Sequence, residues 1–166
     1  MASVIPSPID ERLRGWLEAH EIAYQIHEHP LAYTALATAH AEGVDPATFA
    51  KVVGVRTDTG RVALVVLDAV DALDLRKVAD VVGSPVGLMS ERELAEACPD
   101  WEVGAVPPVP SLAGEQVFAD EAVREDEYIS FNAGNHRVAV RVERSAWEAA
   151  AEITYVDVAR RAAPGG

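Results

Sequence analysis

The chain has 166 residues, 49% of them apolar and 25% charged, a composition typical of a folded protein with a full hydrophobic core. Its net charge of −13 argues against binding to DNA or to long stretches of nucleic-acid backbone. A single cysteine, Cys98, excludes an internal disulfide and suits a reducing compartment. We therefore expect one soluble, cytoplasmic domain over residues 1–166, with no signal peptide and no membrane-spanning segment.

Hydrophobic periodicity and capping signals predict the order of the elements. Apolar residues recurring every three or four positions indicate helices, and strict alternation indicates strands. A small polar residue before such a run marks a helix start, and a glycine after it marks the end. In chain order we expect a helix from Ser7 with Ile9, Leu13, Trp16 and Leu17 on one face, a strand over 24–28, a helix from Thr34 to Gly43, a hairpin of strands 51–56 and 61–68, and a helix over 74–82 that ends at Gly83.

The second half alternates strands with short helices around a proline-rich loop over 101–114. The remaining expected elements are a strand over 85–89, a helix with the capping pair Ser90 and Glu93, strands over 116–119, 128–132 and 136–142, a helix capped by Ser145 and Glu148, and a strand over 153–158. Two of the strand pairs are hairpins. The predicted fold class is therefore mixed α/β (α+β), with a mostly antiparallel mixed sheet and flanking helices.

Common catalytic and cofactor motifs are missing from the sequence. It contains no glycine-rich phosphate loop, no Cys-x-x-Cys pair and no serine nucleophile elbow. His27 and His29 lie two positions apart on an expected strand and could begin a metal site. No further ligand has supporting spacing, so we favour polar residues at a strand edge and expect neither a metal nor a cofactor.

Three other features allow two interpretations each. Lys51 opens an apolar strand, either as a surface residue with a buried stem or as a cation beside a cleft, aimed at a carbonyl oxygen or a phosphate. Gly104-Ala105-Val106-Pro107-Pro108 is either a surface loop or a stiff rim whose free backbone groups contact a ligand. Gly134-Asn135-His136 is either a simple hairpin turn or a turn that places His136 at a pocket mouth.

Five segments, in the same order along the chain, resemble the YbaK/prolyl-tRNA-editing family. The resemblance covers about residues 20 to 158. One departure matters: Val109–Leu112 lacks the Phe-Gly that many members carry there. The matching segments are His29-Pro30, the hairpin Lys51–Val66, the helix start Leu73–Val78, the loop Val103–Pro108 and the turn Ala133–His136.

The resemblance implies the curled sheet of the YbaK/prolyl-tRNA synthetase-associated domain and a stand-alone aminoacyl-tRNA deacylase. The implied substrates are Ala-, Cys- or Ser-tRNA for proline. The implied partners are the tRNA acceptor end and prolyl-tRNA synthetase. Lys51 would be the catalytic residue, holding the acceptor-end backbone or the ester carbonyl. The implied substrate-binding residues are His29, Gly104, Pro107, Pro108, Gly134 and His136.

Two other functions remain open from the residues. One is a non-catalytic module of the same fold that binds tRNA or a synthetase, although the presence of Lys51 favours catalysis. The other is a metal-dependent hydrolase that uses His27 and His29. Cys98 precedes Pro99 at an expected helix end and is interpreted as a packing residue.

Overall fold

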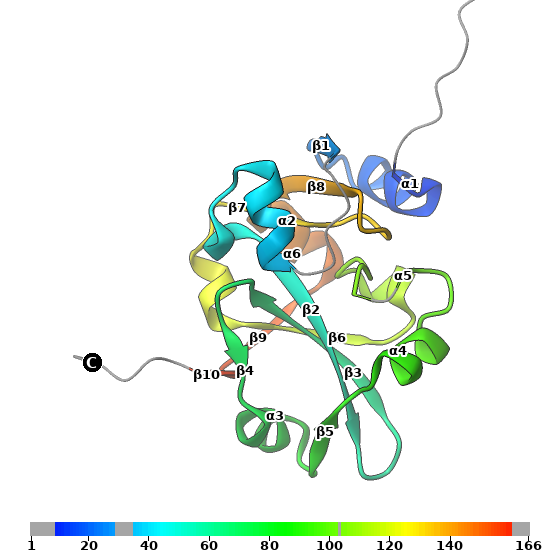
Figure 1. Cartoon of the computed structure of the whole chain (residues 1–166), viewed down its shortest axis with the longest axis vertical. Helices are drawn as coiled ribbons and strands as arrows, with labels where there is room; N and C mark the ends of the chain where they lie inside the picture. The colour runs from blue at the N-terminus through cyan, green and yellow to red at the C-terminus, as the bar shows by residue number, and fades with distance from the viewer. Residues whose placement is uncertain (1–8, 29–34, 103, 161–166) are drawn as a thin grey trace, which may run out of the picture.

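The computed structural model of the protein describes residues 9–28, 35–102 and 104–160 (Figure 1). Its helices are α1 (Glu11–Ala19), α2 (Ala35–Glu42), α3 (Leu75–Val82), α4 (Glu91–Ala97), α5 (Pro110–Ala113) and α6 (Arg144–Ala151), with 3-10 turns η1 (Pro46–Thr48) and η2 (Glu121–Glu125). Its strands are β1 (Tyr24–Glu28), β2 (Ala50–Thr57), β3 (Val62–Asp68), β4 (Ala72–Leu73), β5 (Val86–Leu88), β6 (Gln116–Asp120), β7 (Tyr128–Asn132), β8 (Val138–Glu143), β9 (Thr154–Val156) and β10 (Ala159–Arg160).

The strands form a mixed arrangement that confirms the predicted fold class. The largest sheet has the order β5-β2-β3-β6-β9, antiparallel from β5 to β3 and parallel from β3 to β9. A second sheet, β1-β8-β7, is antiparallel throughout, and β10 pairs with β4. One parallel bridge between Phe49 and Ser130 connects the start of β2 to β7. This bridge fixes how the two larger sheets meet.

Local sequence signals explain several elements directly. Gly60 has φ +85 in the turn between β2 and β3, a conformation that glycine adopts without strain. Asp74 caps α3 by accepting a hydrogen bond from the backbone N of Arg76 at 3.0 Å, and Gly83 ends the helix with φ +77. The capping box of Ser90 and Glu93 at the start of α4 is confirmed.

Helix starts differ from the prediction at both ends of the chain. The N-cap of α1 is Asp10, whose carboxylate accepts from the backbone N of Arg12 at 2.8 Å; Ser7 lies outside the described residues. At α6 the N-cap is Glu143, and its side chain accepts a hydrogen bond from the Ser145 hydroxyl at 2.6 Å. The expected capping by Ser145 is therefore wrong, because that hydroxyl already has a partner just outside the helix.

The loop and strand boundaries of the second half also shift. The proline-rich loop contains the single helical turn α5, with Pro110 at its first position, where the missing N–H costs no hydrogen bond. The strand expected from residue 136 begins only at Val138. His136 therefore belongs to the preceding turn. Thr34, the expected cap of α2, lies outside the described residues.

Hydrophobic side chains pack on both faces of the largest sheet. The main cluster lies between the two larger sheets, α1 and α6, and the second lies beneath α3. All four residues predicted for the inner face of the first helix are buried. The largest fully buried side chains include Leu13, Leu17, Leu64, Phe131 and Trp147 in the main cluster and Val55, Val65, Leu67 and Val78 in the second. Across the described ranges, no helix is long and apolar enough to cross a membrane.

Candidate functional site

Lys51 lies at the start of β2, on the face of the sheet opposite the main core. Its neighbours Ala50 and Val52 pack in the main cluster, so the alternation of a strand directs Lys51 to the other side. The Lys51 side chain is half-buried, and its Nζ lies 3.5 Å from the carbonyl oxygen of Ala69. Burial lowers the pKa of Lys51 below its ordinary value, while the Asp71 carboxylate acts in the opposite direction. The turn after β3 thus holds a partly desolvated cation.

A pair of carboxyl groups begins at the same turn. Asp68 is only 6% exposed, and the carboxyl group of Asp126 acts on it. Burial and then the neighbouring Asp126 raise the pKa of Asp68 to about 9. Burial also raises the pKa of Asp126, while Arg144 acts against this rise and donates from its Nε to the Asp126 backbone oxygen at 2.8 Å. The pair therefore retains a shared proton at neutral pH.

The Phe49–Ser130 bridge brings Lys51 close to the end of β7. The bridge is parallel, so β2 and β7 run in the same direction from it. Lys51 and Asn132 each lie two residues beyond the bridge, about 7 Å along their strands, on the same face as the bridged pair. Asn132 is 7% exposed, and its Oδ1 has no hydrogen-bond partner among the described residues. A buried, unsatisfied amide oxygen therefore lies in the neighbourhood of the ammonium group.

A second unsatisfied polar atom lies on the same face of the three-stranded sheet. His27 of β1 and Asn132 of β7 both pair with Ala139 of β8, so their side chains flank this alanine. Nε2 of His27 is buried and has no hydrogen-bond partner in the described part of the chain. Ala139 packs with Ala39 of α2 and with Phe49. Ala139 is itself fully buried in this cluster, so the two unsatisfied polar atoms flank closely packed apolar side chains.

Asn132 was not predicted from the sequence as a site residue. Its only sequence signal is its position as a polar residue that ends a buried strand just before the Ala133–His136 turn. That signal is weak, because asparagine is common before turns. What distinguishes Asn132 is the lack of a partner, which depends on residues far away in the chain.

The two predicted loops are joined by hydrogen bonds. The backbone N of Glu102 donates to the Gly134 oxygen at 3.1 Å, and the backbone N of Gly134 donates to the Ala105 oxygen at 3.0 Å. The Glu102 carboxylate also accepts from the backbone N of the buried His136 at 3.1 Å. The structure therefore brings residues 102–105 and 133–136 together. Because this turn directly follows Asn132, it also lies next to the region of Lys51.

Both predicted site glycines have a left-handed backbone, with φ +81 at Gly104 and φ +94 at Gly134. A Cβ at Gly134 would lie 2.6 Å from Cε3 of Trp101, a distance that side chains do not tolerate. Gly134 therefore has a packing role in addition to any contact with a ligand.

Pro107 and Pro108 form an interior wall and not an exposed rim. Both are buried, and the Pro108 oxygen accepts a hydrogen bond from the indole Nε1 of Trp147 at 2.8 Å. The expectation of free backbone groups is therefore wrong at Pro108, because its carbonyl satisfies a buried tryptophan.

The remaining candidates are placed as follows. His29 lies outside the described residues, so the metal pair of His27 and His29 stays a hypothesis. Within residues 9–28, 35–102 and 104–160, no three or more His, Cys, Asp or Glu side chains are grouped to hold a metal ion. Cys98 is buried, with its Sγ 3.8 Å from the Ala113 oxygen, and burial raises the pKa of the thiol. These contacts support its interpretation as a packing residue.

Comparisons with solved structures show the fold. The hypothetical protein APE2540 superposes with a TM-score of 0.81 at 20% identity, covering 90% of this chain and 99% of that one. A protein proposed to be a trans-editing enzyme for prolyl-tRNA synthetase gives 0.78 at 23% identity, covering 95% and 100%. A protein from Marinobacter aquaeolei VT8 proposed to act in signal transduction gives 0.71 at 17% identity, with 92% of this chain and 31% of that chain covered.

Sequence comparison gives the family. No curated protein matches the chain. The family model described as the aminoacyl-tRNA editing domain matches residues 29–149. That range contains Lys51, Asn132 and both of the loops that the structure joins. The chain therefore belongs to the aminoacyl-tRNA editing domain family.

Proposed function

We propose that the chain is a stand-alone aminoacyl-tRNA deacylase that hydrolyses mischarged tRNA. The proposal rests mainly on one observation: the Phe49–Ser130 bridge brings the start of β2 and the end of β7 together. Lys51 and Asn132 lie two residues beyond the bridge, and the turn that follows Asn132 is bonded to the loop at 102–105. Membership of the editing family supports the reaction class.

The arrangement suits hydrolysis of an ester that is already activated. Water, or a group of the substrate itself, attacks the carbonyl carbon. The bond from that carbon to the terminal ribose oxygen then breaks, the ribose hydroxyl takes up a proton, and with water as the attacking group the amino acid leaves as a carboxylate. The Lys51 ammonium is the group placed to stabilise negative charge on the ester oxygen or to hold an acceptor-end phosphate. Orientation supplies much of the remaining rate increase, so no strong base is required.

The substrate is, by family resemblance, tRNA for proline carrying Ala, Cys or Ser. The unsatisfied polar atoms of His27 and Asn132, on either side of Ala139, are available to hydrogen-bond a small amino acid. Because one methylene in an apolar pocket changes affinity by only about 1–3 kcal/mol, exclusion of larger amino acids by size is the natural device. In this proposal residues 1–166 act as one editing domain that grips the acceptor end, and prolyl-tRNA synthetase delivers the tRNA.

The proposal is tested by deacylation of tRNA charged with Ala, Ser, Cys, Thr or Pro. Lys51 and Lys77 are the two lysines of the sequence, so Lys77→Ala is the matched control for Lys51→Ala. We expect hydrolysis of at least one small amino acid in preference to Pro, loss of this activity in Lys51→Ala, and its retention in Lys77→Ala. Tight binding of tRNA without hydrolysis would instead favour the non-catalytic module. Full activity in a folded Lys51→Ala protein would contradict the role of Lys51.

A further inference from the structure

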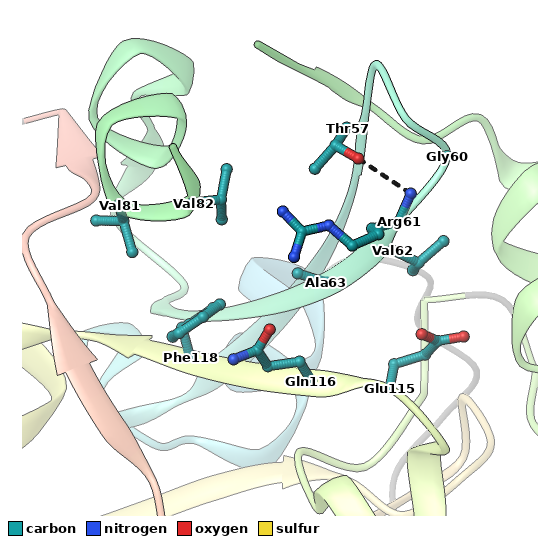
Figure 2. A pocket seen from close by; sticks show the side chains of 10 residues that line it. All are labelled: Thr57, Gly60, Arg61, Val62, Ala63, Val81, Val82, Glu115, Gln116 and Phe118. Carbon is teal, nitrogen blue, oxygen red and sulfur yellow. Dashed lines mark hydrogen bonds between the residues drawn. The ribbon is translucent and has the colours of Figure 1, made fainter. Parts of the chain in front are cut away.

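A cavity of about 520 Å³ lies at the opposite end of β2 from Lys51 (Figure 2). It is open to solvent and is bordered by the turn between β2 and β3, the start of β6 and the last turn of α3. Its volume lies within the range of sites that bind small molecules. The residues lining it that matter here are Thr57, Arg61, Ala63, Val82, Gln116 and Phe118.

Arg61 supplies a positive charge to this cavity. Its backbone is fixed in the hairpin, because its N donates to the Thr57 hydroxyl at 3.0 Å and its oxygen accepts from the Thr57 N at 2.8 Å. Figure 2 shows the guanidinium extending over Ala63 toward Val82. This guanidinium has no hydrogen bond or ion pair within the described part of the chain, whereas Arg56 pairs with Glu93. The charge is therefore available to a ligand in a protein whose own charge is strongly negative.

The rest of the lining combines an apolar wall with one amide. Val82 of α3 and Phe118 of β6 supply apolar surface beside the guanidinium, and the Gln116 side chain lies between Phe118 and the rim (Figure 2). Glu115 lies at the far rim, with its carboxylate directed away from Arg61. An arginine fork favours carboxylates and phosphates, and an amide can donate to the same anion.

We propose that this cavity binds a small organic anion, a carboxylate or a phosphate ester with a compact apolar body. The anionic group lies on the Arg61 guanidinium, and the body packs against Phe118 and Val82. A small molecule is favoured over RNA because a single arginine lines this concave site, and Glu115, which also lines it, is acidic. RNA-binding surfaces instead carry several cations along one face. This site is separate from the proposed deacylase site and does not depend on it.

The experiment follows backbone amide signals of the full chain by NMR during titration with benzoate and with phenyl phosphate. Benzyl alcohol provides the apolar body without charge, and inorganic phosphate provides charge without the body. We expect at least one of the two organic anions to shift the Arg61, Gln116 and Phe118 signals saturably, and both control ligands to bind at least about tenfold more weakly.

The variant Arg61→Gln tests the assigned residue, with Arg76→Gln as a matched control on the exposed start of α3, outside the cavity. We expect Arg61→Gln to weaken anion binding by at least about tenfold and Arg76→Gln to leave it unchanged. Both proteins should keep the wild-type circular dichroism, because the Arg61 side chain has no partner to lose in the described structure. The proposal is overturned by absence of saturable shifts with either anion, by equal binding of benzyl alcohol, or by equal affinity in Arg61→Gln. It is equally overturned if a short RNA oligonucleotide shifts these signals and neither small anion does.

Discussion

The β2–β3 hairpin holds a cation at each end, and the two ends do so in opposite ways. At the start of β2, Lys51 is half-buried against the Ala69 carbonyl, and a buried carboxyl pair adjoins the same turn. At the turn of the hairpin, Arg61 is exposed and anchored only through its backbone. Burial and the contact with the Ala69 carbonyl hold the Lys51 ammonium in place, whereas the Arg61 guanidinium is free for a ligand. Substitution and pH should therefore affect the Lys51 end strongly and the Arg61 end weakly.

The largest expected difference between the two ends is in deacylation. Lys51→Ala should lower the rate by about 10²–10³, the usual loss when one oriented electrostatic contact is removed. Arg61→Gln should leave the rate unchanged, because it lies at the other end of the strand. Single-turnover hydrolysis of the tRNA preferred by the wild type measures both. A comparable loss in the two variants would show that the ends are coupled.

Substitution of Gly134, next to the Lys51 end, and of Gly60, at the Arg61 end, should lower the free energy of unfolding by different amounts. Gly134 and Gly60 have similar backbone angles, but only Gly134 is crowded, by the Trp101 ring. Gly134→Ala should lower the free energy of unfolding by about 2–4 kcal/mol, through backbone strain and the clash together. Gly60→Ala should lower it by only about 1–2 kcal/mol, through strain alone. Urea denaturation monitored by circular dichroism measures the difference. Equal losses would mean that Trp101 moves aside freely.

The carboxyl pair predicts a pH dependence confined to the Lys51 end. The pKa of Asp68 is about 9 in the folded protein, against an ordinary value of 3.8. Between these values the folded state holds a proton that the unfolded state lacks, so the Asp68 contribution is fully present below about pH 4 and is lost as the pH rises toward 9. Asp68→Asn should flatten the decline in unfolding free energy between pH 5 and 9, since an amide donates to Asp126 without titrating.

The control for this prediction is Asp58→Asn at the hairpin turn, where the side chain is exposed. That variant should keep the wild-type slope of unfolding free energy against pH. If Asp68→Asn also keeps the wild-type slope, then Asp68 is ionised in the folded protein, and the shared proton does not exist.

The smallest expected effect concerns tRNA binding. We assign the grip on the acceptor end to Lys51 and the exposed Arg137, because Arg56, at the Arg61 end of β2, is paired with Glu93. Contact with one to three phosphates gives a slope of log affinity against log salt of only about −0.7 to −2. Deacylation of full tRNA and of an acceptor-stem minihelix across a salt series should then differ little. A steep slope with strong preference for full tRNA would require a basic surface beyond the Lys51 end.

The sequence predicted elements whose signals are local. Gly60 in its turn, Asp74 and Gly83 at the ends of α3, and the Ser90–Glu93 capping box depend on neighbours within a few residues. The boundary of β8 was missed because the side chain of Asn135 accepts from the backbone N atoms of Arg137 and Val138, at 2.8 and 3.0 Å, and so extends the turn. Local pattern alone does not distinguish such a turn from a strand.

For the candidate site, the sequence identified Lys51 and the two loops but not how they connect. The hydrogen bonds between Glu102 and Gly134, and the carboxyl pair of Asp68 and Asp126, join residues that are distant in the chain. Asn132 could not be identified either, because a missing hydrogen-bond partner is a property of the folded surroundings. Family resemblance supplied the residues, and the tertiary structure supplied their arrangement.

The pairing of β1 with β8 has a consequence for how the chain folds during synthesis. Tyr24 lies opposite Val142, so β1 cannot find its neighbour until more than a hundred further residues have left the ribosome. The β2–β3 hairpin can form early, because its paired residues are close in the sequence. Contacts between residues that are far apart in the sequence form more slowly. The Phe49–Ser130 bridge joins residues that are far apart in the sequence, so it should form slowly. We therefore expect the region around Lys51 to assemble last, and a nascent chain stalled before residue 130 to hold a formed hairpin without a competent site.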